Sequence, residues 1–63
     1  MAILDDALAL RDAIGTAVKS NETVYNEVPP GGIGWAQLEA IRSRLGLAFS
    51  EAQTVIDAFG GTP

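Results

Sequence analysis

The chain has 63 residues, with eight acidic and four basic side chains and a net charge of −4. It contains neither cysteine nor histidine, which excludes a disulfide framework, the usual zinc sites and a histidine-based catalytic triad. The negative charge disfavours binding to nucleic acid and to anionic lipid. We expect one small domain, near the lower size limit for folding alone, to which a partner can supply part of the stability.

The start of the chain lacks the basic segment and long apolar core of a signal peptide, and no apolar run reaches the roughly 18 residues of a membrane span. We therefore expect a cytoplasmic protein without membrane association, or a virion component if the protein derives from a phage. The residue types present predict no enzyme activity, no cofactor and no metal site.

The first third of the chain has the pattern of an amphipathic helix. Apolar residues recur at helical spacing up to Val18, which predicts a helix over residues 3–19 that ends at Ser20 and Asn21. Residues 22–28 contain several β-branched and aromatic side chains, which favour extended structure. This segment is predicted to be an extended connector or a short strand.

A sharp reversal is predicted over residues 29–34, which include five proline and glycine residues. Pro29 and Pro30 stop a helix, while the glycines permit the positive φ angles of a tight turn. The chain is expected to return to the core at Ile33.

Two further helices are predicted after the reversal. An apolar stripe from Trp35 to Leu45 indicates a helix over residues 35–45, which Gly46 ends. The capping-box pattern of Ser50 to Gln53 predicts a third helix over residues 50–59. The expected fold is therefore an all-α, three-helix domain spanning residues 1–59, with a helix-turn-helix-like corner formed by the last two helices. Residues 60–63 are expected to be a terminal tail or the start of a linker.

The segment from Leu38 to Ile56 resembles the helix-turn-helix unit of small bacterial and phage regulators, and Gly32-Ile33 looks like the start of a winged helix. The resemblance implies a DNA-binding transcriptional regulator. Against this alternative, no wing follows Phe59, and the presumed recognition helix carries Glu51 and Asp57 but no basic residue to contact phosphate. The residues that carry the resemblance are Leu45, Gly46, Leu47, Ala52 and Val55.

Aromatic residues that flank the proline-glycine turn predict a contact surface, because such side chains anchor many protein interfaces. The alternative is that Trp35 only covers the edge of the core. The sequence favours a non-enzymatic protein–protein docking or assembly domain, such as the N-terminal anchoring domain of a longer phage or bacterial accessory protein. The predicted partner-binding residues are Tyr25, Val28, Pro29, Pro30 and Trp35.

Self-association is also expected, because 48% of the residues are hydrophobic and a core of this size cannot enclose them all. The row of small residues Ala9, Ala13 and Ala17 in the first helix would allow two backbones to approach. We expect an equilibrium between monomer and oligomer.

Overall fold

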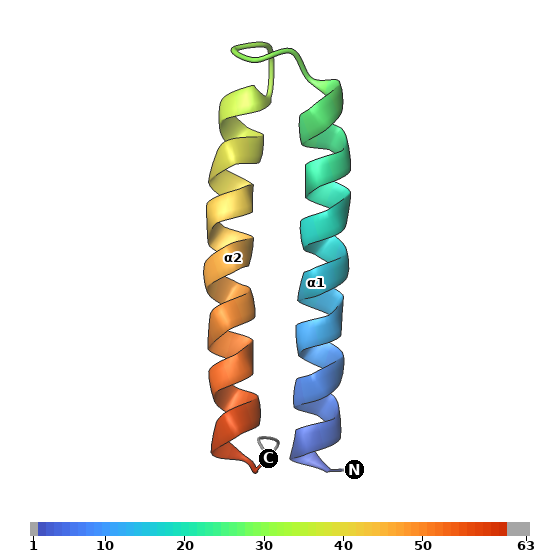
Figure 1. Ribbon diagram of the computed structural model, residues 1–63, viewed down its shortest axis with the longest axis vertical. Coiled ribbons are helices and arrows are strands. Elements are labelled where there is room, and N and C mark those ends of the chain that lie inside the picture. Colours follow the sequence, from blue (N-terminus) through green and yellow to red (C-terminus); the bar gives the residue numbers. More distant parts are fainter. Residues whose placement is uncertain (1, 61–63) are drawn as a thin grey trace.

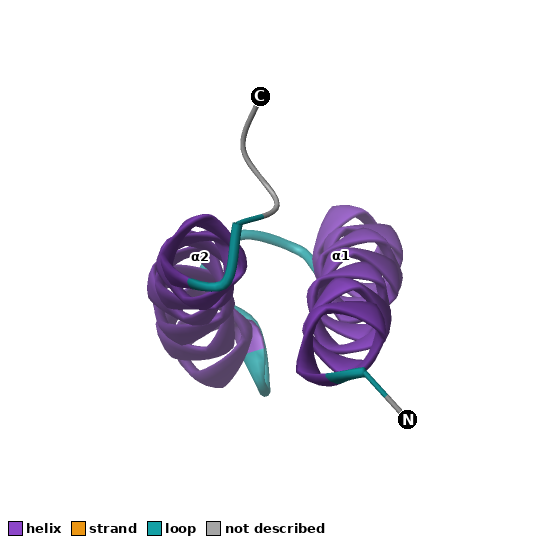
Figure 2. Cartoon of the chain, turned by 90° about the horizontal axis from the view of Figure 1, so that it is seen from below, coloured by secondary structure: helices purple, strands orange, loops and turns teal. Residues whose placement is uncertain are grey.

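The computed structural model describes residues 2–60 and consists of two long helices joined by a short loop (Figure 1). Helix α1 spans Ile3–Glu27 and helix α2 spans Trp35–Ala58. The helices run antiparallel and side by side, as the view along their axes also shows (Figure 2). The hairpin is elongated, because its Cα radius of gyration of 14.3 Å exceeds the value of about 11 Å expected for a compact domain of this length.

The prediction of an all-α fold is confirmed for the described residues, but the prediction of three helices is wrong. Helix α1 continues past residue 19 through the segment that was expected to be extended. The helices predicted over residues 35–45 and 50–59 are parts of the continuous helix α2, so there is no turn at Gly46 and no corner. Of the tail predicted at residues 60–63, Gly60 follows α2 in a turn, and residues 61–63 lie outside the described residues.

The two helices pack along a seam whose residues recur at alternating spacings of three and four, the heptad pattern of a coiled coil. This pattern keeps one stripe of each helix directed toward the other over its whole length. All the seam residues except Arg42 and Phe59 are buried or half-buried. They are Leu4, Ala7, Arg11, Ile14, Val18, Asn21, Tyr25 and Val28 from α1 and its C-cap, and Trp35, Leu38, Arg42, Leu45, Phe49, Ala52, Ile56 and Phe59 from α2 and its C-cap.

The seam explains why both helices pass through residues that disfavour a helix. Gly46 lies between Leu45 and Phe49, which belong to one unbroken stripe, so a break there would take the second half of α2 off the seam. A glycine in a helix interior costs only about 1 kcal/mol relative to alanine, less than the packing of several further turns. Tyr25 and Val28 continue the stripe of α1 in the same way, because tertiary packing overrides a weak β preference.

The predicted reversal over residues 29–34 is present. The amide of Gly32 donates to the carbonyl of Pro29 at 2.8 Å, and Gly31 has a φ of 78°. Proline followed by a glycine of positive φ at the two central positions is the pattern of a type II turn. Gly34, with a φ of 85°, then leads into α2. The loop therefore requires glycine at two positions where another residue would be strained.

The hairpin encloses a very small core. Within residues 2–60, the only buried hydrophobic residues are Ala7, Ala52 and Ile56. Eight larger hydrophobic side chains are exposed, among them Leu10, Ile33 and Leu47. Neither described helix combines the length and apolar character needed to cross a membrane. Two helices alone thus leave much apolar surface in contact with water.

Candidate functional site

All five residues predicted to bind a partner lie at the loop end of the hairpin. Tyr25 is near the end of α1, Pro29 and Pro30 are in the loop, and Trp35 begins α2. The two prolines are exposed, while Tyr25, Val28 and Trp35 are half-buried. Residues ten positions apart in the sequence are thereby brought to one end of the molecule.

Tyr25 and Trp35 stack across the seam. Their ring centroids are 5.8 Å apart and their planes are inclined by 23°. Offset stacking of this kind stabilises a pair beyond the area that it buries. The two rings therefore form a fixed aromatic platform under the loop.

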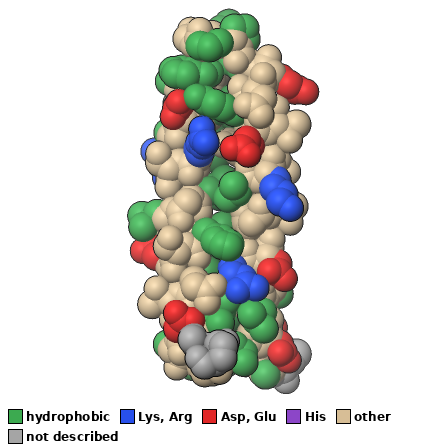
Figure 3. Space-filling model, in the orientation of Figure 1, with side chains coloured by type: hydrophobic (Ala, Val, Ile, Leu, Met, Phe, Trp, Pro, Cys, Tyr) green, Lys and Arg blue, Asp and Glu red, His purple; other side chains and the backbone are tan. Residues whose placement is uncertain are grey.

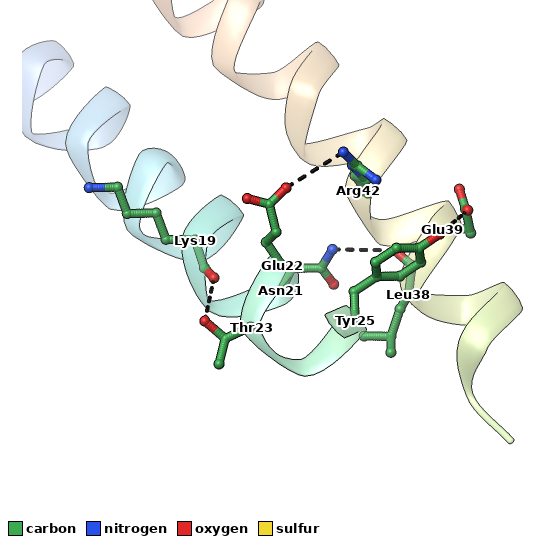
Figure 4. A network of polar contacts seen from close by, with 8 residues as sticks. All are labelled: Lys19, Asn21, Glu22, Thr23, Tyr25, Leu38, Glu39 and Arg42. Carbon is green, nitrogen blue, oxygen red and sulfur yellow. Dashed lines mark hydrogen bonds and ion pairs between the residues drawn. The ribbon is translucent and has the colours of Figure 1, made fainter. Parts of the chain in front are cut away.

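Polar side chains of α2 hold Tyr25 in place (Figure 4). The Tyr25 hydroxyl donates to a carboxylate oxygen of Glu39 at 2.5 Å. The guanidinium of Arg42 lies over the Tyr25 ring, 5.5 Å from its centroid, and also pairs with Glu22 at 3.5 Å. Because these contacts cross the seam, they join the last turns of α1 to the first turns of α2.

The same contacts change the ionisation of the tyrosine. The hydrogen bond to Glu39 raises the pKa of Tyr25 above its ordinary value of 10.0, because ionisation would remove the donated proton and place two negative charges together. Partial desolvation adds to this increase, whereas the positive charge of Arg42 opposes it. Tyr25 is thus held in its neutral, hydrogen-bonding form.

Asn21 is the one buried polar residue within the described chain, with 9% of its surface accessible. Its amide nitrogen donates to the backbone carbonyl of Leu38 at 3.3 Å (Figure 4). A buried polar residue in a helical seam favours one alignment of the helices, because any shift would leave its amide without a partner. Asn21 therefore fixes the register beside the aromatic platform.

Ile33 was expected to return to the core, and this prediction is wrong. Its side chain is wholly exposed, with a relative accessibility of 101%. The two-helix hairpin has no third element above the loop that would cover it. An isoleucine that projects from the loop between exposed prolines and the aromatic platform extends the predicted contact surface.

Sequence reasoning missed the supporting residues of this site. Glu39 accepts a hydrogen bond from Tyr25, and Arg42 pairs with Glu22 of α1. The missed signal is the spacing along α1, because Glu22 and Tyr25 fall on the side facing α2 only if the helix continues to residue 27. The capping box at Ser50 is also absent, since Ser50 lies inside α2 and its carbonyl accepts from Thr54.

A second concave region lies halfway along the seam. Two adjoining shallow hollows of about 400 and 360 Å³ lie there beside Gly15 and Phe49, and Gly46 lines the second of them. Arg11 and Lys19 flank them. In the space-filling view, basic and acidic side chains lie beside the hydrophobic side chains of the groove between the helices (Figure 3). Both hollows are open to solvent. Charged and polar residues form much of the first, whereas the second is lined mainly by small and apolar groups.

The arrangement provides contact surfaces but few reactive groups. No group of three or more Cys, His, Asp or Glu side chains within residues 2–60 is placed to hold a metal ion. Comparison of the sequence with known protein families gives no match, and neither curated proteins nor solved structures provide a significant one. The resemblance to helix-turn-helix regulators stays a prediction.

Proposed function

We propose that the hairpin is a non-enzymatic docking domain whose loop end binds a protein partner. The observation that carries this proposal is the exposure of Ile33 beside the stacked Tyr25 and Trp35 rings. An exposed aliphatic side chain costs free energy in water and regains it when a partner covers it. The aromatic pair adds contact area that loses little side-chain entropy on binding, because it is already ordered.

The polar contacts below the platform support the same proposal. Glu39, Arg42 and Glu22 fix the platform without covering the loop, so the contact surface is preorganised. Preorganisation increases affinity because less conformational freedom is lost on binding. The exposed prolines contribute further apolar area of fixed shape.

Photo-cross-linking tests the proposal in the cells that make the protein. A photoreactive amino acid at position 30, in the loop, is compared with one at position 12, which is exposed on α1. We expect position 30 to give a covalent adduct with a different protein and position 12 to give none. Equal adducts from both positions, or none from position 30, would argue against a docking site at the loop.

Matched substitutions then locate the contact. Ile33→Ser removes the exposed side chain of the loop, and Leu47→Ser makes a similar change on the outer side of α2, where Leu47 is 63% exposed. We expect only Ile33→Ser to reduce the adduct, while circular dichroism shows equal helicity for both variants. Trp35→Ala is expected to reduce the adduct as well, provided that its helical signal is retained.

A further inference from the structure

A second surface of the hairpin, separate from the loop end, carries two rows of apolar residues. Each row stands one position before every second seam residue of its helix and therefore repeats every seven residues. We call this surface the apolar face. It consists of Ile3, Leu10, Ala17 and Val24 from α1 and Ile41, Ala48 and Val55 from α2.

The two rows lie on the same side of the molecule. The two antiparallel helices of a hairpin are related by an approximate twofold axis perpendicular to the plane that contains them. Residues at the same heptad position in the two helices therefore point to the same side of the hairpin. Gly15 and Gly46 are equivalent positions on the other flank, and they line one hollow. The ion pair between Glu22 and Arg42 lies on that flank too. The side of the hairpin drawn in Figure 3 and the apolar face are therefore opposite sides of the molecule.

The apolar face is open to solvent. Its five large side chains are between 39% and 58% exposed, and neither row contains a charged residue. The chain exposes 4534 Å² in total, whereas a folded monomer of 6.6 kDa is expected to expose about 3,900 Å². The excess of roughly 600 Å² approaches the area of about 800 Å² that each partner contributes to a stable interface.

We propose that a second copy of this chain covers the apolar face and that the two hairpins form a four-helix bundle. A partner that covers the whole apolar face must be as long as the hairpin and must carry apolar residues at the same seven-residue spacing. A second copy of the chain meets both requirements. The contacts of Tyr25 with Glu39 and of Arg11 with Gln53 set the register of the two helices. In this register Leu10 lies level with Val55, Ala17 with Ala48, and Val24 with Ile41. A copy turned about a twofold axis parallel to the helices keeps these levels, so large side chains meet large ones in two layers, and the alanines between them allow the hairpins to approach closely.

This interface differs from the one expected from the small-residue row of α1. Ala17 belongs to the apolar face, but Ala9 and Ala13 are exposed residues of α1 that lie outside its row. The second copy is therefore placed against both helices at once. Its binding does not depend on the function proposed for the loop end.

Sedimentation equilibrium of the full chain tests the proposal. We expect the wild type to convert from monomer to dimer with increasing concentration in the micromolar range, with a melting temperature that rises with concentration. Leu10→Lys, on the apolar face, is expected to weaken the dimer more than about tenfold, because pairing would bury an unpaired charge. The matched variant Leu47→Lys, on the outer side of α2, is expected to change it less than about twofold.

A monomer mass from micromolar to millimolar concentration with unchanged melting would overturn the proposal, as would equal effects of the two lysine substitutions. Photo-cross-linking covers the case in which Leu10→Lys fails to fold. A photoreactive residue at position 10 is expected to give an adduct of twice the chain mass, and one at position 47 is not. The reverse pattern would also overturn the proposal. A monomeric result leaves the test of the loop end unaffected, since that test detects a different protein.

Discussion

At the scale of single residues, the glycines of this chain have opposite roles that depend on backbone conformation. Gly46 is inside α2, and a Cβ built there meets no atom within 4 Å. Gly46→Ala should therefore stabilise the hairpin by about 0.5–1 kcal/mol, the difference in helix propensity. Chemical denaturation followed by circular dichroism measures the change. Gly34→Ala is the control, and it should destabilise the hairpin because the φ of 85° strains any residue with a side chain.

Asn21 provides a second test at this scale. Asn21→Ala removes the hydrogen bond to Leu38 together with buried volume in the seam, and we expect a loss of about 1–2 kcal/mol. Asn26→Ala makes the same chemical change at an exposed position of α1 and should alter stability by less than about 0.5 kcal/mol. Equal effects of the two substitutions in urea unfolding would show that the buried amide does not stabilise this register.

At the scale of the helices, the cluster around Tyr25 makes the junction of α1 and α2 sensitive to alkaline pH. The pKa of Tyr25 is higher in the folded hairpin than in the unfolded chain, chiefly because of the hydrogen bond to Glu39. The resulting stabilisation is present below pH 10 and is lost as the pH rises through the folded pKa. We expect the urea midpoint to fall above pH 10, and the fall to be smaller in Tyr25→Phe, which lacks the ionisable hydroxyl. An identical pH profile for both proteins would contradict this assignment.

Sequence reasoning located the helical regions but not the extent of the helices. The reversal at residues 29–34 was predictable because its proline and glycine chemistry is local. The continuity of α2 through Gly46 was not, because it depends on packing against α1, where Phe49 lies beside Gly15, far away in the sequence. In the same way, Tyr25 and Trp35 were recognised as neighbours of the turn, while Glu39 and Arg42 joined the site only through pairing across the seam.

The heptad pattern is present in the sequence, but the helix ends predicted at Ser20 and Gly46 interrupt it. Ser20 and Asn21 have the composition of a helix exit, and Gly46 has that of a helix stop. Each of these residues lies inside a helix that a partner helix extends. Local end signals therefore carry little weight where an apolar stripe continues in register beyond them.

At the scale of the whole molecule, the hairpin has two apolar surfaces, and its elongated shape allows their roles to be separated. The chain extends 43 Å in one direction and 17 and 16 Å in the others. Pairing through the apolar face places two copies side by side, which doubles the mass while the longest dimension stays close to that of one hairpin. Pairing through the loop ends would place them end to end and nearly double that dimension. We expect small-angle scattering of the dimer to give a maximum dimension close to that of the monomer, with a markedly larger cross-section. A maximum dimension near twice the monomer value would assign self-association to Ile33, Tyr25 and Trp35 and leave the apolar face without its proposed occupant.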